Sequence, residues 1–160
     1  MERIEKIRKH VLFLDGLRRN AAAEADRCFC HHDMAHFLDV ARIGVIINLE
    51  EELEVPKEMI YAAALLHDIG KHRQYGEGIP HEQASAAAAL EILAGCGFDD
   101  KETSVITDAI LQHRNGDVVW ERNLRGLLYR ADKASRPCFV CDRSEQCDWK
   151  GSKKNREIRY

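Results

Sequence analysis

Six ionisable side chains stand on helix-forming stretches at positions where the hydrophobic pattern requires apolar residues. They are His36, His67, Asp68, His81, His113 and Asp132. Burying an imidazole beside a carboxylate is costly unless another group satisfies both of them. Neutral imidazoles and carboxylates that converge in a helical core are the ligands that divalent transition metals take. The six residues together therefore indicate a metal site.

The strongest local signal is the stretch 61–71, which reads YAAALLHDIGK. It begins as an apolar helix, places His67-Asp68 where the core should continue, and is broken by Gly70. Taken alone, the stretch leaves two interpretations open: a ligand pair, or a helix end at which His67 caps carbonyls and Asp68 faces water. The other ionisable residues favour the ligand pair. One such residue is more often a satisfied core residue, but a whole set is hard to explain member by member.

The ligand types narrow the choice of metal. Nitrogen and carboxylate ligands without thiolate suit Fe, Mn, Zn or Co better than Cu(I) or an iron–sulfur cluster. The set is too large for one catalytic ion that keeps a position open for water, but it suffices for two ions that share a carboxylate. Asp68, between two sets of histidines, is the predicted bridge. Two such ions would hold a hydroxide and clamp a phosphoryl oxygen, which is the arrangement for in-line hydrolysis of a phosphoester.

Helices must position these side chains, and apolar residues recur at helical spacing along most of the chain. We expect about six helices, over approximately 2–19, 33–52, 56–69, 80–95, 99–114 and 120–135. The third is apolar on nearly every side, so it should lie in the middle of a bundle. The stretch 70–80 is expected to be a loop. Because no β-strand pattern of any length appears, the sequence predicts a single all-α domain over residues 1–136.

A further histidine, His32, could form a chelating pair with His36 through the spacing His-x3-His. We rank His36 above it, because His36 begins an apolar stripe that continues through Val40 and Ile47. His32 instead precedes Asp33, the expected helix cap. It should therefore be frayed or exposed.

Composition and charge set the remaining bounds. The 160 residues are 45% hydrophobic and 32% charged with a net charge of −3, as in an ordinary globular domain that does not bind nucleic acid. No apolar run approaches the about 18 residues that span a bilayer. The N-terminal MERIEKIRKH lacks the apolar stretch of a secretion signal. With six cysteines and no export signal, we expect a cytoplasmic protein with reduced thiols.

The order His36…His67-Asp68…Asp132 resembles the signature of the HD-domain superfamily of metal-dependent phosphohydrolases. The segment ALLHDIGK is very close to the family's most recognisable element. The segments HFLDVAR, PHE and YRADK, which begin at residues 36, 80 and 129, resemble its flanking elements. The resemblance covers approximately residues 30–136.

The resemblance implies both the fold and the ligands. Members are all-α proteins, and the resemblance implies one metal bound by His36, His67, Asp68 and Asp132. Members with added histidines between the HD pair and the last aspartate bind two metals, often iron. His81 and His113 stand where those histidines would.

Basic residues close to the ligands are candidates for binding substrate. They are Lys71, Arg114, Lys133 and Arg136. Lys71 could contact a substrate phosphate or stabilise charge in the transition state, so we assign it a catalytic role together with Asp68. The alternative for Lys71 is a solvated lysine at a helix end.

The sequence thus predicts a hydrolase that attacks a nucleotide, or another phosphoester or phosphoanhydride, with a metal-activated hydroxide. Its partner would be a small phosphorylated molecule, neither a membrane nor a nucleic acid, and a homo-oligomer is compatible with the sequence. Family members that hydrolyse dinucleoside tetraphosphates fit the pattern. Cyclic-dinucleotide phosphodiesterases fit less well, because Arg114 follows His113 in place of a second histidine and the GYP element is missing. Two alternatives stay open: a regulatory module that binds metal and nucleotide without turnover, and a di-iron oxygenase.

Residues 137–160 form a basic, cysteine-containing extension that we expect to pack on or near the helical domain. Three thiolates are available there, from Cys138, Cys141 and Cys147. Cys28 or Cys30 could supply a fourth, which would make a structural zinc site or a small cluster. Reduced cysteines without a ligand role are the alternative.

Overall fold

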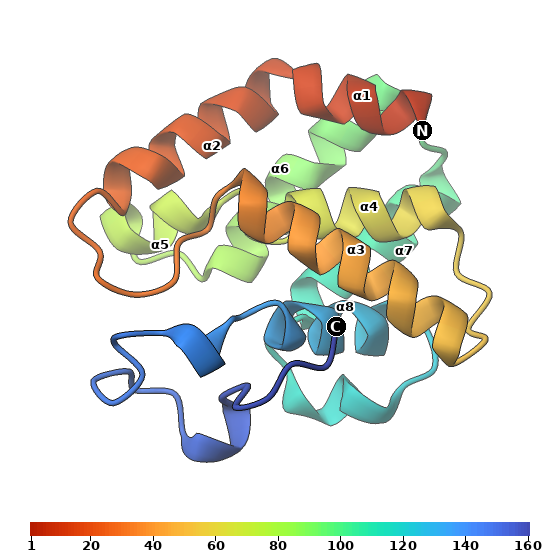
Figure 1. Ribbon diagram of the computed structural model, residues 1–160. Coiled ribbons are helices and arrows are strands. Elements are labelled where there is room, and N and C mark those ends of the chain that lie inside the picture. Colours follow the sequence, from red (N-terminus) through yellow and green to blue (C-terminus); the bar gives the residue numbers. More distant parts are fainter.

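A computed structural model describes residues 1–160, apart from the side chain of Ser152, and its described residues contain helices but no strand (Figure 1). The α-helices are α1 (Glu2–Lys9), α2 (Val11–Ala23), α3 (Met34–Glu50), α4 (Lys57–Leu66), α5 (Lys71–Glu77), α6 (His81–Cys96), α7 (Asp100–Gln112) and α8 (Leu124–Ala134). Three short 3-10 helices are η1 (Gly116–Trp120), η2 (Cys138–Val140) and η3 (Gly151–Lys153). The predicted all-α class is confirmed.

The helix count exceeds the prediction because two segments were misread. The expected helix over 2–19 is two helices, since His10 has an extended backbone and its Nδ1 accepts the N–H of Leu12 as the N-cap of α2. The loop expected over 70–80 was also wrong, because α5 forms there and ends at Gly78, whose φ is 71°. A helix this short, with glycines at both ends, carries too few turns for its periodicity to be read.

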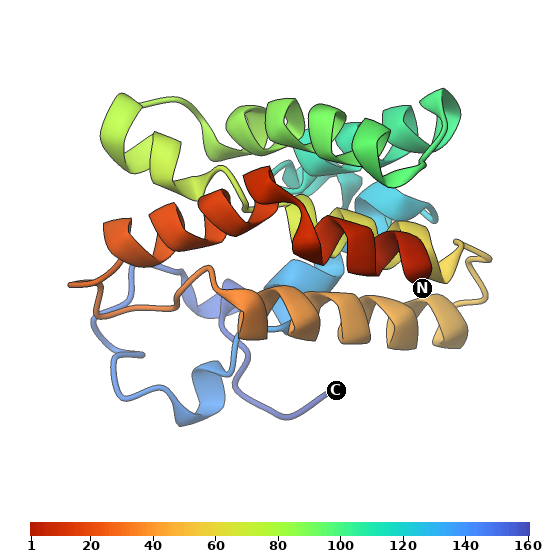
Figure 2. The same cartoon turned by 90° about the horizontal axis from the view of Figure 1, so that it is seen from above.

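Helix α4 lies at the centre of the bundle, as its all-round apolar sequence predicted. It packs against α1, α3, α6, α7 and α8, and in Figures 1 and 2 it runs among these helices. Nearly all of its side chains are buried, from Met59 to Leu66. Its run of alanines lets the neighbouring backbones come close. The C-terminus of α4 therefore opens into the interior, where His67 and Asp68 follow.

The turn after α4 is held in place from two sides. The buried amide of Asn20 donates to the carbonyl of Asp68 at 2.9 Å and accepts the backbone N–H of His72 at 2.8 Å. From α6, the Ser85 hydroxyl accepts the N–H of Gly70 at 3.0 Å. These bonds satisfy buried backbone groups and fix the position of the Asp68 side chain.

The chain from 137 to 160 forms no long helix and runs beside the loop 24–33 that joins α2 to α3 (Figures 1 and 2). Near its end, the Asn155 amide donates to the carbonyls of Lys133 and Arg136 at 2.8 and 2.7 Å. These bonds attach the extension to the C-terminus of α8. In the part of the chain that the structure describes, no helix has the length and apolar character to cross a membrane.

Replacing Gly70 with alanine should destabilise the fold. A Cβ there would lie 2.6 Å from the backbone nitrogen of Ser85 and 2.7 Å from the carbonyl carbon of Ala84, so a backbone segment would have to shift. We expect Gly70→Ala to lower the free energy of unfolding by about 1–3 kcal/mol, measured by urea denaturation. The control is Gly76→Ala in α5, where a Cβ meets nothing within 4 Å. The control should be as stable as the parent or up to about 1 kcal/mol more stable. Equal stability of the two variants would contradict the close packing.

Candidate metal centre

The six residues singled out in the sequence come together in the interior of the bundle. They form two groups that share Asp68, and within each group the ligand atoms lie within 4.8 Å of one another. The first group is His36, His67, Asp68 and Asp132; the second is Asp68, His81 and His113. All six side chains are buried, with exposed fractions of 7% or less.

Helix ends deliver most of these side chains. His36 lies in the first turn of α3, which the Asp33 carboxylate caps by accepting the N–H of His36 at 3.0 Å. His81 is the first residue of α6, and His113 follows the last residue of α7. Asp132 lies in the last turn of α8, on the buried face of that helix.

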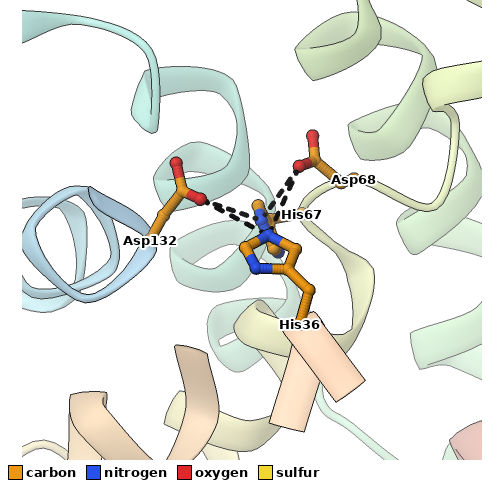
Figure 3. Close-up of side chains that lie close together, drawn as sticks. All are labelled: His36, His67, Asp68 and Asp132. Atoms are coloured by element: carbon orange, nitrogen blue, oxygen red, sulfur yellow. Dashed lines mark ion pairs between the residues drawn. The ribbon is translucent and has the colours of Figure 1, made fainter. Parts of the chain in front are cut away.

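The carboxylates of Asp68 and Asp132 lie on opposite sides of the imidazole rings of His36 and His67 (Figure 3). Oδ2 of Asp68 lies 3.2 Å from Nε2 of His67 and 3.8 Å from Nε2 of His36. Oδ1 of Asp132 lies 3.4 Å from Nε2 of His36 and 3.7 Å from Nε2 of His67. The two imidazoles thus sit between the two acids.

The second oxygen of Asp68 faces the other histidine group. Its Oδ1 lies 3.1 Å from Nε2 of His81 and 3.6 Å from Nε2 of His113. Each oxygen of this carboxylate is therefore directed at a different set of histidines. This is the geometry that a carboxylate shared between two cations requires.

Hydrogen bonds on the far side of each ring direct Nε2 toward the centre. The Nδ1–H of His67 donates to the carbonyl of Ala64 at 2.7 Å, and that of His113 donates to Ile110 at 2.6 Å. Nδ1 of His81 donates to the Gln74 amide oxygen at 2.5 Å.

The ring of His36 is also held by a hydrogen bond from Nδ1–H. Because the Ser135 hydroxyl gives its proton to the carbonyl of Asp132, Nδ1–H of His36 donates to Ser135 Oγ at 3.2 Å. Such bonds fix the tautomer of a metal-ligating histidine.

Several buried atoms at the centre lack a partner. Nε2 of His67, Oδ1 of Asp68 and Oδ1 of Asp132 accept or donate no hydrogen bond and are shielded from solvent. In addition, Nε2 of His81 and Nε2 of His113 lie 3.2 Å apart, although Nδ1 of each ring carries its proton. Two facing lone pairs repel each other unless a cation lies beside them. The donor set therefore fits a divalent cation.

The protonation of the centre is also suited to a cation. Burial lowers the pKa of His36 to about 4 and that of His81 to about 3, so both rings are neutral at pH 7. Burial favours the acid form of Asp68 and Asp132, but their cationic neighbours outweigh it and hold each pKa well below its usual value. Burial opposes the charge on His67, yet the two carboxylates raise its pKa to about 10. That proton balances buried negative charge that a divalent cation would otherwise balance.

The predicted substrate-binding residues surround one cavity of about 320 Å³ beside this centre. The cavity is lined by Lys71, Arg114, Lys133 and Arg136, together with Asp68, His81, His113 and Asp132. Nζ of Lys71 lies 3.1 Å from Nδ1 of His81, and Arg114 pairs with Glu82 at 3.0 Å.

Lys133 and Arg136 lie close to Asp132 and His36. Nζ of Lys133 is 2.5 Å from Oδ2 of Asp132. Arg136 is buried and donates to Nε2 of His36 at 3.0 Å and to the carbonyl of His31 at 3.1 Å. Both side chains thus contact candidate ligands directly as well as lining the cavity.

His32 was expected to be frayed or exposed, and this prediction was wrong. His32 is buried, because the carboxylate of Glu24 accepts its backbone N–H at 2.8 Å and also its Nδ1–H. Glu24 is itself buried and accepts the Tyr75 hydroxyl at 2.8 Å. Nε2 of His32 lies 3.7 Å from Oδ2 of Asp68, so His32 is oriented like the other histidines of the centre. The spacing His32-x3-His36 was the available signal, but the role of Glu24 depends on a contact between segments.

The chain is similar to known proteins over all or part of its length. A family model described as the HD domain matches residues 34–136. The chain is 44% identical, over all 160 residues and the full length of both proteins, to an uncharacterized protein of Clostridium beijerinckii. It is 39% identical over 57 residues to a bifunctional uridylyltransferase/uridylyl-removing enzyme of Gluconobacter oxydans, which covers 36% of this chain but 6% of that enzyme. No solved structure matches the chain.

Divalent cations should stabilise the protein through Asp132. Metal that binds the folded form alone, at a hundred times its dissociation constant, adds about 2.7 kcal/mol to the free energy of unfolding. We expect Mn²⁺ to raise the melting temperature of the parent, and Asp132→Ala to reduce that rise, because Asp132 belongs to one of the two groups of candidate ligands. The control is His31→Ala, whose side chain is 47% exposed and belongs to neither group of candidate ligands. An equal metal-induced rise in the parent and in Asp132→Ala would contradict the assignment.

Proposed function

The chain belongs to the HD domain family, and on that premise we propose that it is a metal-dependent phosphohydrolase that acts on a nucleotide or a related phosphoester or phosphoanhydride. The observation that carries the proposal is the placement of Asp68. Its two oxygens face separate histidine groups, and the cationic cavity lies directly beside them. This combination fits hydrolysis of a phosphorylated molecule better than it fits a purely structural metal site.

The residues at this centre have two roles, which are to bind cations and to bind the phosphate of the substrate. His36, His67 and Asp132 would hold one cation, His81 and His113 a second, and Asp68 would be shared between them. Cations bound there supply a Lewis acid for a phosphoryl oxygen and lower the pKa of water. Lys71 and Lys133, on the cavity wall, attract the phosphate and stabilise the negative charge that develops during its transfer.

The cavity supports a polyphosphorylated or nucleotide substrate. Six basic residues line it: Arg27, Lys71, Arg114, Lys133, Arg136 and Lys154. This is more positive charge than a single phosphate needs. Trp149 also lines the cavity and offers an aromatic face on which a base can stack. The volume of about 320 Å³ suits a small molecule. The partial likeness to an enzyme named for removing uridylyl groups agrees with a nucleotide-containing substrate.

Loss of the Asp68 charge should abolish turnover. The metal-loaded parent is assayed with dinucleoside polyphosphates, mononucleotides and bis(p-nitrophenyl) phosphate, by measuring released nucleotide, phosphate or nitrophenol. We expect turnover of at least one of them, and a loss of roughly 100-fold or more in Asp68→Asn. The control is Asp39→Asn, an exposed carboxylate on α3, which should keep the parental rate. Tight nucleotide binding without product would instead identify a regulatory module, and oxygen-dependent product formation would identify a di-iron oxygenase.

Lys71 should contribute through its charge. A charge-assisted hydrogen bond to a phosphate is worth about 1.5–3 kcal/mol, so we expect Lys71→Met to lower kcat/KM by roughly 10–100-fold. The matched control is Arg73→Met on the same helix, because Arg73 pairs with Glu77 at 2.8 Å and does not line the cavity. Metal content should be the same in both variants. Equal kcat/KM in Lys71→Met and the parent would place Lys71 outside the reaction.

A further inference from the structure

Four cysteines from two distant segments line one wall of the cavity. Cys30 comes from the loop between α2 and α3, and Cys138, Cys141 and Cys147 come from the extension after α8. Burial raises the pKa of the Cys30 thiol, and the neighbouring Cys138 and Cys141 raise it further, as expected where several thiols share one space. Of the two cysteines left open as a fourth partner, Cys30 reaches this wall. Cys28 is exposed and does not line this cavity.

The extension lacks a core that would hold it in place. None of its described side chains from 137 to 160 is fully buried. Apart from Trp149, its large apolar side chains are exposed, with Val140 at 69% and Ile158 at 76%. The cysteines show the opposite pattern, since Cys138, Cys141 and Cys147 are all partly buried toward the cavity. A short segment with cysteines inside and apolar residues outside needs a crosslink or a metal for its stability.

The local backbone suits a shared ion. The N–H of Cys141 donates to the carbonyl of Cys138 at 3.3 Å, which closes a turn across the Cys-x2-Cys pair. This spacing is common in zinc sites with thiolate ligands. All six cysteines are free thiols in the structure. No disulfide therefore occupies the positions that a metal would use.

Basic groups flank the thiols and would offset the negative charge of four thiolates around a divalent ion. Arg27 donates to the carbonyl of Cys30 at 2.9 Å, and Lys154 donates to the carbonyl of Cys147 at 3.2 Å. Arg136 holds the same loop through the carbonyl of His31 at 3.1 Å. Outside the histidine–aspartate groups, the described side chains include no three ligand atoms within 4.8 Å of one another. Closure around an ion therefore requires rotation of the cysteine side chains.

We propose that Cys30, Cys138, Cys141 and Cys147 bind one zinc ion as a tetrathiolate site, separate from the histidine–aspartate centre. This site fastens the extension to the loop 24–33 and so holds Trp149 and Lys154 in the cavity wall. The proposal does not depend on the hydrolase activity, because it concerns different ligands and a different wall of the cavity. It requires only that the four thiolates bind the same ion.

The test measures zinc that is released by thiol modification. Asp68→Ala protein, which lacks the carboxylate that both histidine groups share, is prepared under reducing conditions with zinc, so that the thiolate site can be read without the other centre. Addition of p-hydroxymercuribenzoate should release one zinc per chain, detected with a chromogenic chelator. Cys30→Ser in the same background should release none. The matched control, Cys28→Ser, should release one, because Cys28 is exposed and lies outside the cavity wall.

A second measurement uses the unsubstituted chain and does not depend on how a variant folds. Trypsin should cut the extension at Lys150 and Lys153 several-fold faster after zinc is removed with the mercurial and a chelator. Readdition of zinc after reduction should restore protection. Release of no zinc, equal release from Cys30→Ser and Cys28→Ser, or unchanged cleavage would overturn the proposal. An intramolecular disulfide found by mass spectrometry, or iron with acid-labile sulfide in place of zinc, would overturn it as well.

Discussion

Two carboxylates buried among histidine rings form the constraint on which the rest of this structure depends. Asp68 and Asp132 are removed from solvent, and their oxygens face Nε2 atoms at 3.1 to 3.8 Å. Buried charge is tolerated only when it is paired. The protonated ring of His67 pairs part of it, and a divalent cation would pair it more completely. The contacts around the centre hold these carboxylates and imidazole rings in position.

These contacts are made by residues that do not touch the two carboxylate groups. The central position of α4 carries the His67-Asp68 pair inward, and Asn20 and Ser85 fix the turn that follows. Carbonyl, amide and hydroxyl oxygens behind the histidine rings hold each Nδ1–H, so that Nε2 points to the carboxylates. Preorganisation of this kind costs stability locally, and the surrounding apolar core offsets that cost.

Two kinds of candidate metal ligand line the same cavity. On one side lie the nitrogen and oxygen ligands, which suit cations that bind and activate phosphoryl groups. On the other side lie thiols, which suit a soft or borderline ion with a structural role. Basic side chains between them, such as Lys71 and Lys133, make the space attractive to an anion. An extension without a core of its own thereby becomes part of the wall that a substrate would meet.

Much of the fold and the centre could be predicted from the sequence for one physical reason. Hydrophobic periodicity marks the buried face of each helix, and an ionisable residue on that face, such as His36 or Asp132, must find a partner. The helices α3, α4, α6, α7 and α8, and the six positions that meet in the interior, follow from that rule. Chain order and spacing also pointed to the HD family, to which the chain belongs.

Only the tertiary structure decided what depends on contacts between distant segments. Periodicity could not reveal the break at His10 or the helix α5, whose ends are set by capping and by glycine. It placed His32 in solvent, although Glu24 buries it beside Asp68. It also left Cys28 and Cys30 equivalent, whereas in the fold Cys30, and not Cys28, lines the cavity that Cys138, Cys141 and Cys147 line together. Local pattern therefore determined which residues are buried, and packing between segments determined which of them meet.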